Sequence, residues 1–136
     1  MAIALLSVGL LGLLVFLLGI NVSRERGSVI LTQHEAEADP SSGLRKAIRA
    51  HGNCIEYVPM LALMIMALGL RLPVMPMWIS ALMVVAVIGR YVHAVGVLTG
   101  ESIYKPNPLK AIGALATYIS GIIFAIVLVV RAFALF

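Results

Sequence analysis

One predicted helical stripe gathers four polar side chains: Arg45, Arg49, Asn53 and Glu56. Their spacings are four, four and three residues, so a helix places them within roughly 80° of one another. Arg49 and Glu56 lie two turns apart, about 10 Å along the axis, and we expect no direct pairing within one helix. The stripe suits a small zwitterionic or anionic ligand. Its arginines hold carboxylates, Glu56 accepts an ammonium group, and Asn53 donates and accepts hydrogen bonds.

A second pair of ionisable residues, Arg90 and His93, shares one helical face one turn apart. The alternative to a ligand site is that Arg49 and Arg90 extend toward lipid headgroups while Glu56 pairs with one of them. Charge placement alone leaves both interpretations open. The arginines and Glu56 fall in apolar surroundings, where a charged side chain costs about 2.5 kcal/mol or more.

The elements that must position these residues are membrane-spanning helices. Of the 136 residues, 62% are apolar and 12% charged, against about 45–50% and about 25% in soluble domains. The mean hydropathy is +1.08. We expect a single domain over residues 1–136, an all-α bundle of four transmembrane helices. The expected spans are about residues 2–22, 44–70, 77–98 and 109–130.

Short connections predict up-down-up-down packing, with alternate loops on one side of the membrane. The first and third loops and their flanks carry most of the basic residues: Arg24, Arg26, Arg45, Lys46, Arg49, Lys105 and Lys110. The opposite side has only Arg71 and Arg131. The positive-inside rule then predicts both termini outside and both basic loops in the cytoplasm. A net charge of +4, dispersed among apolar segments, excludes nucleic-acid binding.

The remaining chemistry-bearing residues have plainer interpretations. No metal site is expected, because the three histidines have no ligand spacing among themselves. Cys54 is expected to be a small packing residue, and Tyr118 an anchor at the membrane interface. Gly113 and Gly121 in the last span predict close helix contact. The polar segment around Asp39-Pro40 is the natural candidate for an ordered functional loop.

The segment Arg49-Ala50-His51-Gly52-Asn53-Cys54-Ile55-Glu56-Tyr57-Val58-Pro59 resembles the second-helix signature of the MAPEG family. These are the membrane-associated proteins of eicosanoid and glutathione metabolism, and Gly89-Arg90-Tyr91-Val92-His93 resembles their third-helix segment. The resemblance implies a homotrimer that binds glutathione between neighbouring subunits, near the cytoplasmic face. It also implies the residues that hold glutathione: Arg49, Asn53, Glu56 and Tyr57, with Arg90 and His93 beside them and Arg24 or Arg26 from the adjacent subunit.

Two departures from the family pattern concern thiol activation. The position one turn after His93 is commonly Tyr in the family and is Val97 here. No arginine stands where the family's thiol-activating arginine lies, near the start of the fourth span, and Lys105 and Lys110 are the candidates. Either lysine can lower a thiol pKa, but a lysine is a point charge and lacks the guanidinium fork.

The function implied is a membrane glutathione transferase, or a glutathione peroxidase, that receives a lipophilic electrophile from the bilayer. Catalysis would rest on positioning and thiolate stabilisation. The alternative is a non-catalytic glutathione- or lipid-binding scaffold of the same fold, which the missing Tyr and the missing arginine favour. A small-molecule transporter is a weaker interpretation, because the loops are short and the chain has no internal repeat.

Overall fold

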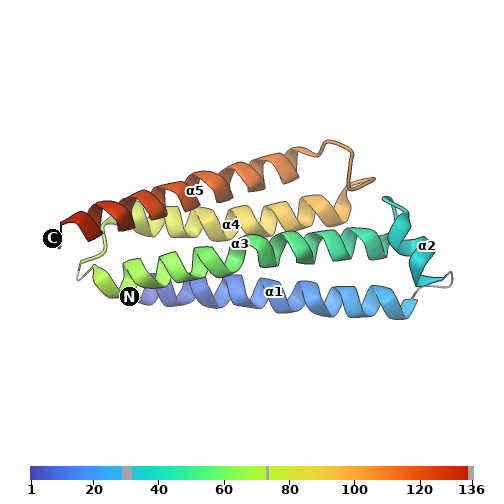
Figure 1. Cartoon of the computed structure of the whole chain (residues 1–136), viewed down its shortest axis with the longest axis horizontal. Coiled ribbons are helices and arrows are strands. Elements are labelled where there is room, and N and C mark those ends of the chain that lie inside the picture. The colour runs from blue at the N-terminus through green and yellow to red at the C-terminus, as the bar shows by residue number, and fades with distance from the viewer. Residues whose placement is uncertain (29–31, 73, 135–136) are drawn as a thin grey trace.

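Four long antiparallel helices and one short helix make up the part of the chain that the computed structural model describes, residues 1–28, 32–72 and 74–134. In chain order the helices are α1 (Ala2–Ser28), α2 (Gln33–Ala38), α3 (Gly43–Arg71), α4 (Met77–Thr99) and α5 (Pro108–Phe133). The four long helices are each long and apolar enough to cross a membrane. They lie side by side, and α2 lies at one end of the bundle (Figure 1). The predicted all-α four-helix bundle is confirmed.

Two features of the first connection differ from the sequence prediction. Helix α1 continues to Ser28, past the predicted end near residue 22. Its apolar run ends there, but the following Arg-Glu-Arg residues are good helix formers, so the helix leaves the apolar zone without unwinding. The polar segment also contains α2, which begins with a capping box. Thr32 Oγ1 accepts from Glu35 N at 3.4 Å, and Glu35 Oε2 accepts from Thr32 N at 3.2 Å.

Helices α3 and α4 form the centre of the bundle, and both α1 and α5 pack against the two of them. Fully buried side chains at the centre include Leu11, Ile65 and Phe124. The closest approach is between α4 and α5, where a Cβ on Gly113 would lie 2.5 Å from both the Gly89 carbonyl oxygen and a backbone nitrogen of α4. The prediction of close contact holds at Gly113, because only a glycine fits there.

The first and third connections meet at one end of the bundle. Ile103 N donates to Pro40 O at 3.0 Å, and Lys46 Nζ donates to Gly100 O at 3.3 Å. The amino terminus, the α3–α4 connection and the last turn of α5 lie at the other end (Figure 1). Alternate loops therefore share an end, as the up-down-up-down prediction required. We call these the loop end and the terminal end.

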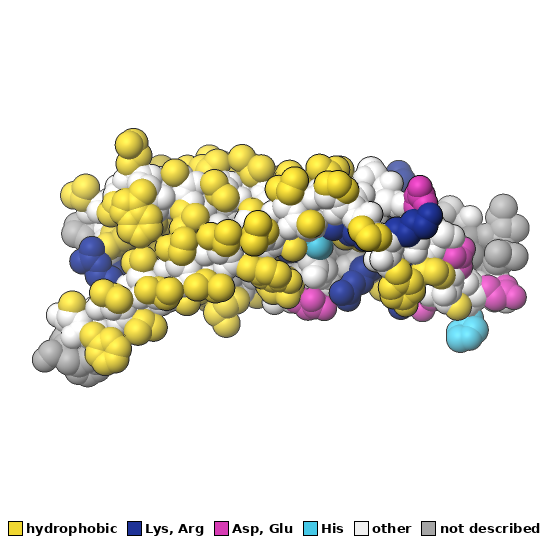
Figure 2. Space-filling model, turned by 90° about the horizontal axis from the view of Figure 1, so that it is seen from above, with side chains coloured by type: hydrophobic (Ala, Val, Ile, Leu, Met, Phe, Trp, Pro, Cys, Tyr) yellow, Lys and Arg dark blue, Asp and Glu magenta, His cyan; other side chains and the backbone are white. Residues whose placement is uncertain are grey.

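The face of the bundle seen in Figure 2 is apolar over most of its length, and large apolar side chains are exposed on all four long helices. Large side chains such as Phe16, Leu63 and Ile122 are more than half exposed. A soluble protein rarely presents apolar surface on this scale, whereas hydrocarbon is its natural solvent. The protein is therefore an integral, multi-pass membrane protein.

Candidate functional site

A buried arginine lies at the centre of the predicted site. Arg90 is 1% exposed on α4, and its Nη2 donates to two acceptors of Asn53, the backbone oxygen at 3.1 Å and Oδ1 at 3.0 Å. The guanidinium carbon lies 5.5 Å from the centre of the Tyr57 ring, within the range of a cation–π contact. We call Asn53, Tyr57 and Arg90 the inner cluster. Its charge is met by an amide and a ring rather than by a carboxylate.

The predicted stripe on α3 divides into two surfaces. Asn53 is 9% exposed and faces α4, whereas Arg49 and Glu56 are exposed. On a helical wheel Asn53 lies about 40° to one side of Arg49 and Glu56 about 20° to the other, so Asn53 stands at the inward edge. We call Arg49 and Glu56 the outer face. Glu56 forms an ion pair with neither Arg49 nor Arg90, because the ion pairs of the described chain are Arg24–Glu25 and Lys105–Glu101.

The packing of α1 against α3 shows how deep the outer face lies in the membrane. Gly69 lies against Ala4, and Gly19 lies against His51. Interpolation between these two contacts gives the point on α1 that is level with Glu56. That point lies about seven residues, or about 10 Å, before the end of the apolar part of α1. The carboxylate therefore lies within the apolar zone, where an unpaired charge is costly.

A groove between α3 and α5 begins at Glu56. Its other lining residues include Tyr57, Met60, Met64 and Tyr118. The hydroxyl oxygens of Tyr57 and Tyr118 lie 3.3 Å apart, and their ring centroids are 5.5 Å apart. The groove is thus polar at one end and apolar along the rest. Sequence reasoning had taken Tyr118 for an interfacial anchor, and no spacing signal links two tyrosines that are 61 positions apart.

The His93 ring bonds to the start of α5. Its Nδ1 lies 2.9 Å from Lys110 O, the carbonyl oxygen of the first turn of α5. A carbonyl oxygen only accepts, so Nδ1 carries the hydrogen. His93 lines a shallow depression with Tyr104, Lys105 and Lys110. The structure thus brings His93 together with the two candidate lysines.

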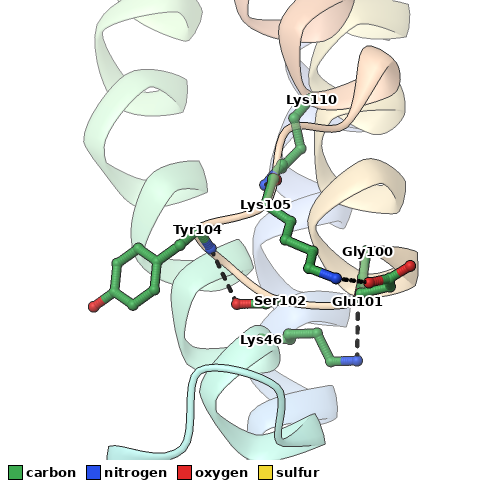
Figure 3. A network of polar contacts seen from close by, with 7 residues as sticks. All are labelled: Lys46, Gly100, Glu101, Ser102, Tyr104, Lys105 and Lys110. Carbon is green, nitrogen blue, oxygen red and sulfur yellow. Dashed lines mark hydrogen bonds and ion pairs between the residues drawn. The ribbon is translucent and has the colours of Figure 1, made fainter.

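Both candidate lysines bond within the α4–α5 connection (Figure 3). Lys105 Nζ pairs with the Glu101 carboxylate. Lys110 Nζ donates to Lys105 O at 2.6 Å and to Ile103 O at 3.2 Å. In this arrangement the two ammonium groups hold the loop, and neither has a bond to the inner cluster.

Arg26 lies on a separate surface of the chain. It is exposed and lines a groove between α1 and α3 together with Ser23, His51 and Ile55. Its neighbour Arg24 has a carboxylate of Glu25 at 3.6 Å. Within one chain Arg26 therefore does not join the groove that begins at Glu56. Its expected role concerns a neighbouring subunit and stays a prediction.

The fold and the site define a class: a four-helix membrane protein with a polar cluster in its apolar zone. The family model that matches the chain is the MAPEG family, over residues 4–130. The chain belongs to the MAPEG family, and the resemblance seen in its second and third spans is confirmed. Membership supports a function in glutathione or eicosanoid metabolism at a membrane. Comparison with curated proteins and with solved structures gives no match.

Proposed function

We propose that the protein is a membrane-bound glutathione transferase, with peroxide reduction as a related activity, and that glutathione binds on the outer face. The supporting observation is that Glu56, inside the apolar zone, and Arg49, at its edge, are exposed and share no ion pair. A charge there costs about 2.5 kcal/mol or more without a partner. Glutathione carries two carboxylates and one ammonium group, so it supplies an anion for Arg49 and a cation for Glu56.

The same observation supports a homotrimer. Lipid is a poor neighbour for an exposed arginine and glutamate, so a second copy of the chain covers this face and encloses the ligand. A heterologous contact of this kind closes into a ring when the rotation between copies is 120°. In that ring the neighbouring α1 contributes Arg26, or Arg24, to the bound tripeptide. The basic loop end then faces the cytoplasm, and both termini lie on the other side.

The chemistry we propose is attack of the glutathione thiolate on an apolar electrophile. A sulfur–carbon bond forms, the leaving group departs with the bonding electrons, and the thiol proton passes to solvent. The electrophile reaches the site laterally from the bilayer along the groove of Met60, Met64 and Tyr118, whose flexible side chains tolerate varied shapes. Lys105 or Lys110 stabilises the thiolate electrostatically after leaving its present loop partners.

A non-catalytic glutathione- or lipid-binding scaffold is the second candidate. Both lysines are already bonded within their own loop. Val97, at the position where the family commonly has Tyr, is buried in the core at 4% exposure. Under this proposal the protein binds glutathione through the same outer face and leaves the thiol protonated.

The test combines thiolate absorbance with turnover of an aryl halide by the purified protein. The transferase proposal expects a thiolate signal on glutathione addition, and loss of both signal and turnover in Lys105→Gln or Lys110→Gln. Lys46→Gln is the matched control, because this lysine also bonds to the loop but has no proposed role with the thiol. Binding without a thiolate signal would support the scaffold. A monomeric mass in detergent would contradict the intersubunit site.

A further inference from the structure

A second pocket lies at the terminal end of the bundle, far from the outer face. It is formed by the last turns of α3 and α5 and combines two arginines with an apolar wall: Arg71, Arg131, Leu68, Leu72, Leu128 and Ala132. Glu56 is about 15 residues, or about 22 Å, away along α3. The pocket is therefore separate from the proposed glutathione site.

Within the described residues, the two arginines of this pocket have no acidic side chain at their own end of the bundle. The chain has six acidic residues. Five of them lie in or beside the connections at the loop end, and the sixth is Glu56. Figure 2 shows basic side chains, in dark blue, at the terminal end with no acidic side chain beside them on that face. The two arginines thus form a positive site with apolar surroundings.

We propose that this pocket binds an anionic phospholipid. The guanidinium groups of Arg71 and Arg131 hold the phosphate, which their planar donor forks match in geometry. An acyl chain lies against the lining residues that are not buried, Leu128, Ala132 and Ala67. A lipid fills both the polar and the apolar part of the pocket, whereas a soluble anion fills only the polar part.

The carboxyl ends of the helices at this pocket repel an anion. The positive charge of the two arginines must exceed this repulsion. The carboxyl ends of α3 and α5 each carry a partial charge of about −0.5. Two full positive charges exceed that sum, so a net positive potential remains for the phosphate. An interfacial basic residue contributes about 1 kcal/mol to binding an anionic lipid, and two correspond to roughly 30-fold.

Lipid retention in native mass spectrometry tests the proposal. The detergent-purified protein is titrated with phosphatidylglycerol, with phosphatidylcholine of the same acyl chains, and with glycerol phosphate. We expect about 30-fold preference for phosphatidylglycerol over phosphatidylcholine, and little binding of glycerol phosphate. Equal retention of the two lipids would overturn the proposal. Glycerol phosphate binding as tight as the lipid would assign the pocket to a free phosphate instead.

Substitutions test whether the lipid preference comes from this pocket. Arg71→Gln/Arg131→Gln should abolish the preference, and each single variant should lower it about fivefold. Arg24→Gln/Lys46→Gln removes the same charge from the loop end and should leave the preference intact. Arg71→Lys/Arg131→Lys keeps the charge and should retain part of it. An unchanged preference in the folded single variants would contradict the proposed pocket, independently of any result with glutathione.

Discussion

The inner cluster and the outer face come from the same few turns of α3, yet they are built in opposite ways. Asn53 and Arg90 are buried and bonded to each other, and Tyr57 covers the guanidinium. Arg49 and Glu56 are exposed and share no ion pair. The inner cluster therefore finds hydrogen-bond partners for Arg90 Nη2 within one chain and leaves only the buried Arg90 Nε without one, whereas neither residue of the outer face has an ion pair within the described chain.

This difference separates structural from functional residues within a single motif. A group that is hydrogen-bonded inside the chain contributes to folding. Its loss leaves a buried partner with no hydrogen bond from the chain or from water. A group that the chain leaves unsatisfied at membrane depth requires a ligand or a neighbouring subunit. We therefore expect substitutions in the inner cluster to reduce stability and those on the outer face to reduce binding.

The largest effect should come from removing the acceptor of the buried arginine. Asn53→Leu leaves Arg90 without its side-chain partner, and a hydrogen bond to a charged group contributes about 1.5–3 kcal/mol. We expect the free energy of unfolding in mixed micelles to fall by about this amount. The double variant Asn53→Leu/Arg90→Leu should recover part of it, because apolar replacement of both partners is often tolerated.

Glu56→Gln is the control for that comparison. It should not lower the unfolding free energy, and without a bound ligand it should raise it, because it removes an unpaired charge from the apolar zone. Equal destabilisation by Glu56→Gln and Asn53→Leu would erase the distinction between the inner cluster and the outer face.

A second test concerns the packing that supports the inner cluster from the α5 side. Gly113→Ala places a Cβ 2.5 Å from backbone atoms of α4, and overpacking of this kind costs about 1–3 kcal/mol. Thermal unfolding followed by circular dichroism measures the loss. Gly12→Ala is the matched control, because a Cβ there meets nothing within 4 Å. It should be neutral or stabilising by up to about 1 kcal/mol. The opposite ranking would contradict the described α4–α5 contact.

The next prediction, with a smaller effect, concerns the loop end. It tests whether this end, like the inner cluster, is held by hydrogen bonds within the chain. Thr32→Ala removes the capping box of α2 and should cost about 1 kcal/mol of local stability. Limited proteolysis of the first connection should accelerate several-fold, while the four long helices stay protected. Unchanged cleavage would show that the capping box does not hold this segment.

Sequence reasoning found the four spans, their antiparallel order and the residues of both surfaces. It treated Arg49, Asn53 and Glu56 as one stripe, because helical periodicity gives angles but not which edge a neighbouring helix covers. The turn of His93 toward Lys110 depends on the path of the α4–α5 connection, which spacing does not determine. Helix α2 was missed although Thr32 and Glu35 carry its capping signature, since Pro40 and the serines that follow it suggested a loop.

The smallest predicted effect is a pH dependence in the first connection. Hydrogen bonds from the Ser41 hydroxyl, and then from its backbone N–H, hold the pKa of the Asp39 carboxyl below its usual 3.8. Because the folded pKa is the lower one, the stabilisation is present above the ordinary pKa and is lost as pH falls through the lowered value. Exchange of the Ser41 amide, corrected for its intrinsic rate, should accelerate below about pH 3.8. Loss of protection already at or above the ordinary carboxyl pKa would contradict it.

The central claim is that the outer face binds glutathione while the inner cluster maintains the fold. Calorimetric titration of glutathione into the wild type, Glu56→Gln and Arg49→Gln tests it most directly, with Arg71→Gln at the far end of α3 as the control. We predict binding by the wild type and the control, and affinities at least about tenfold lower in the two outer-face variants, with no loss of unfolding free energy. No binding by the wild type, or equal affinity in all four proteins, would contradict the account.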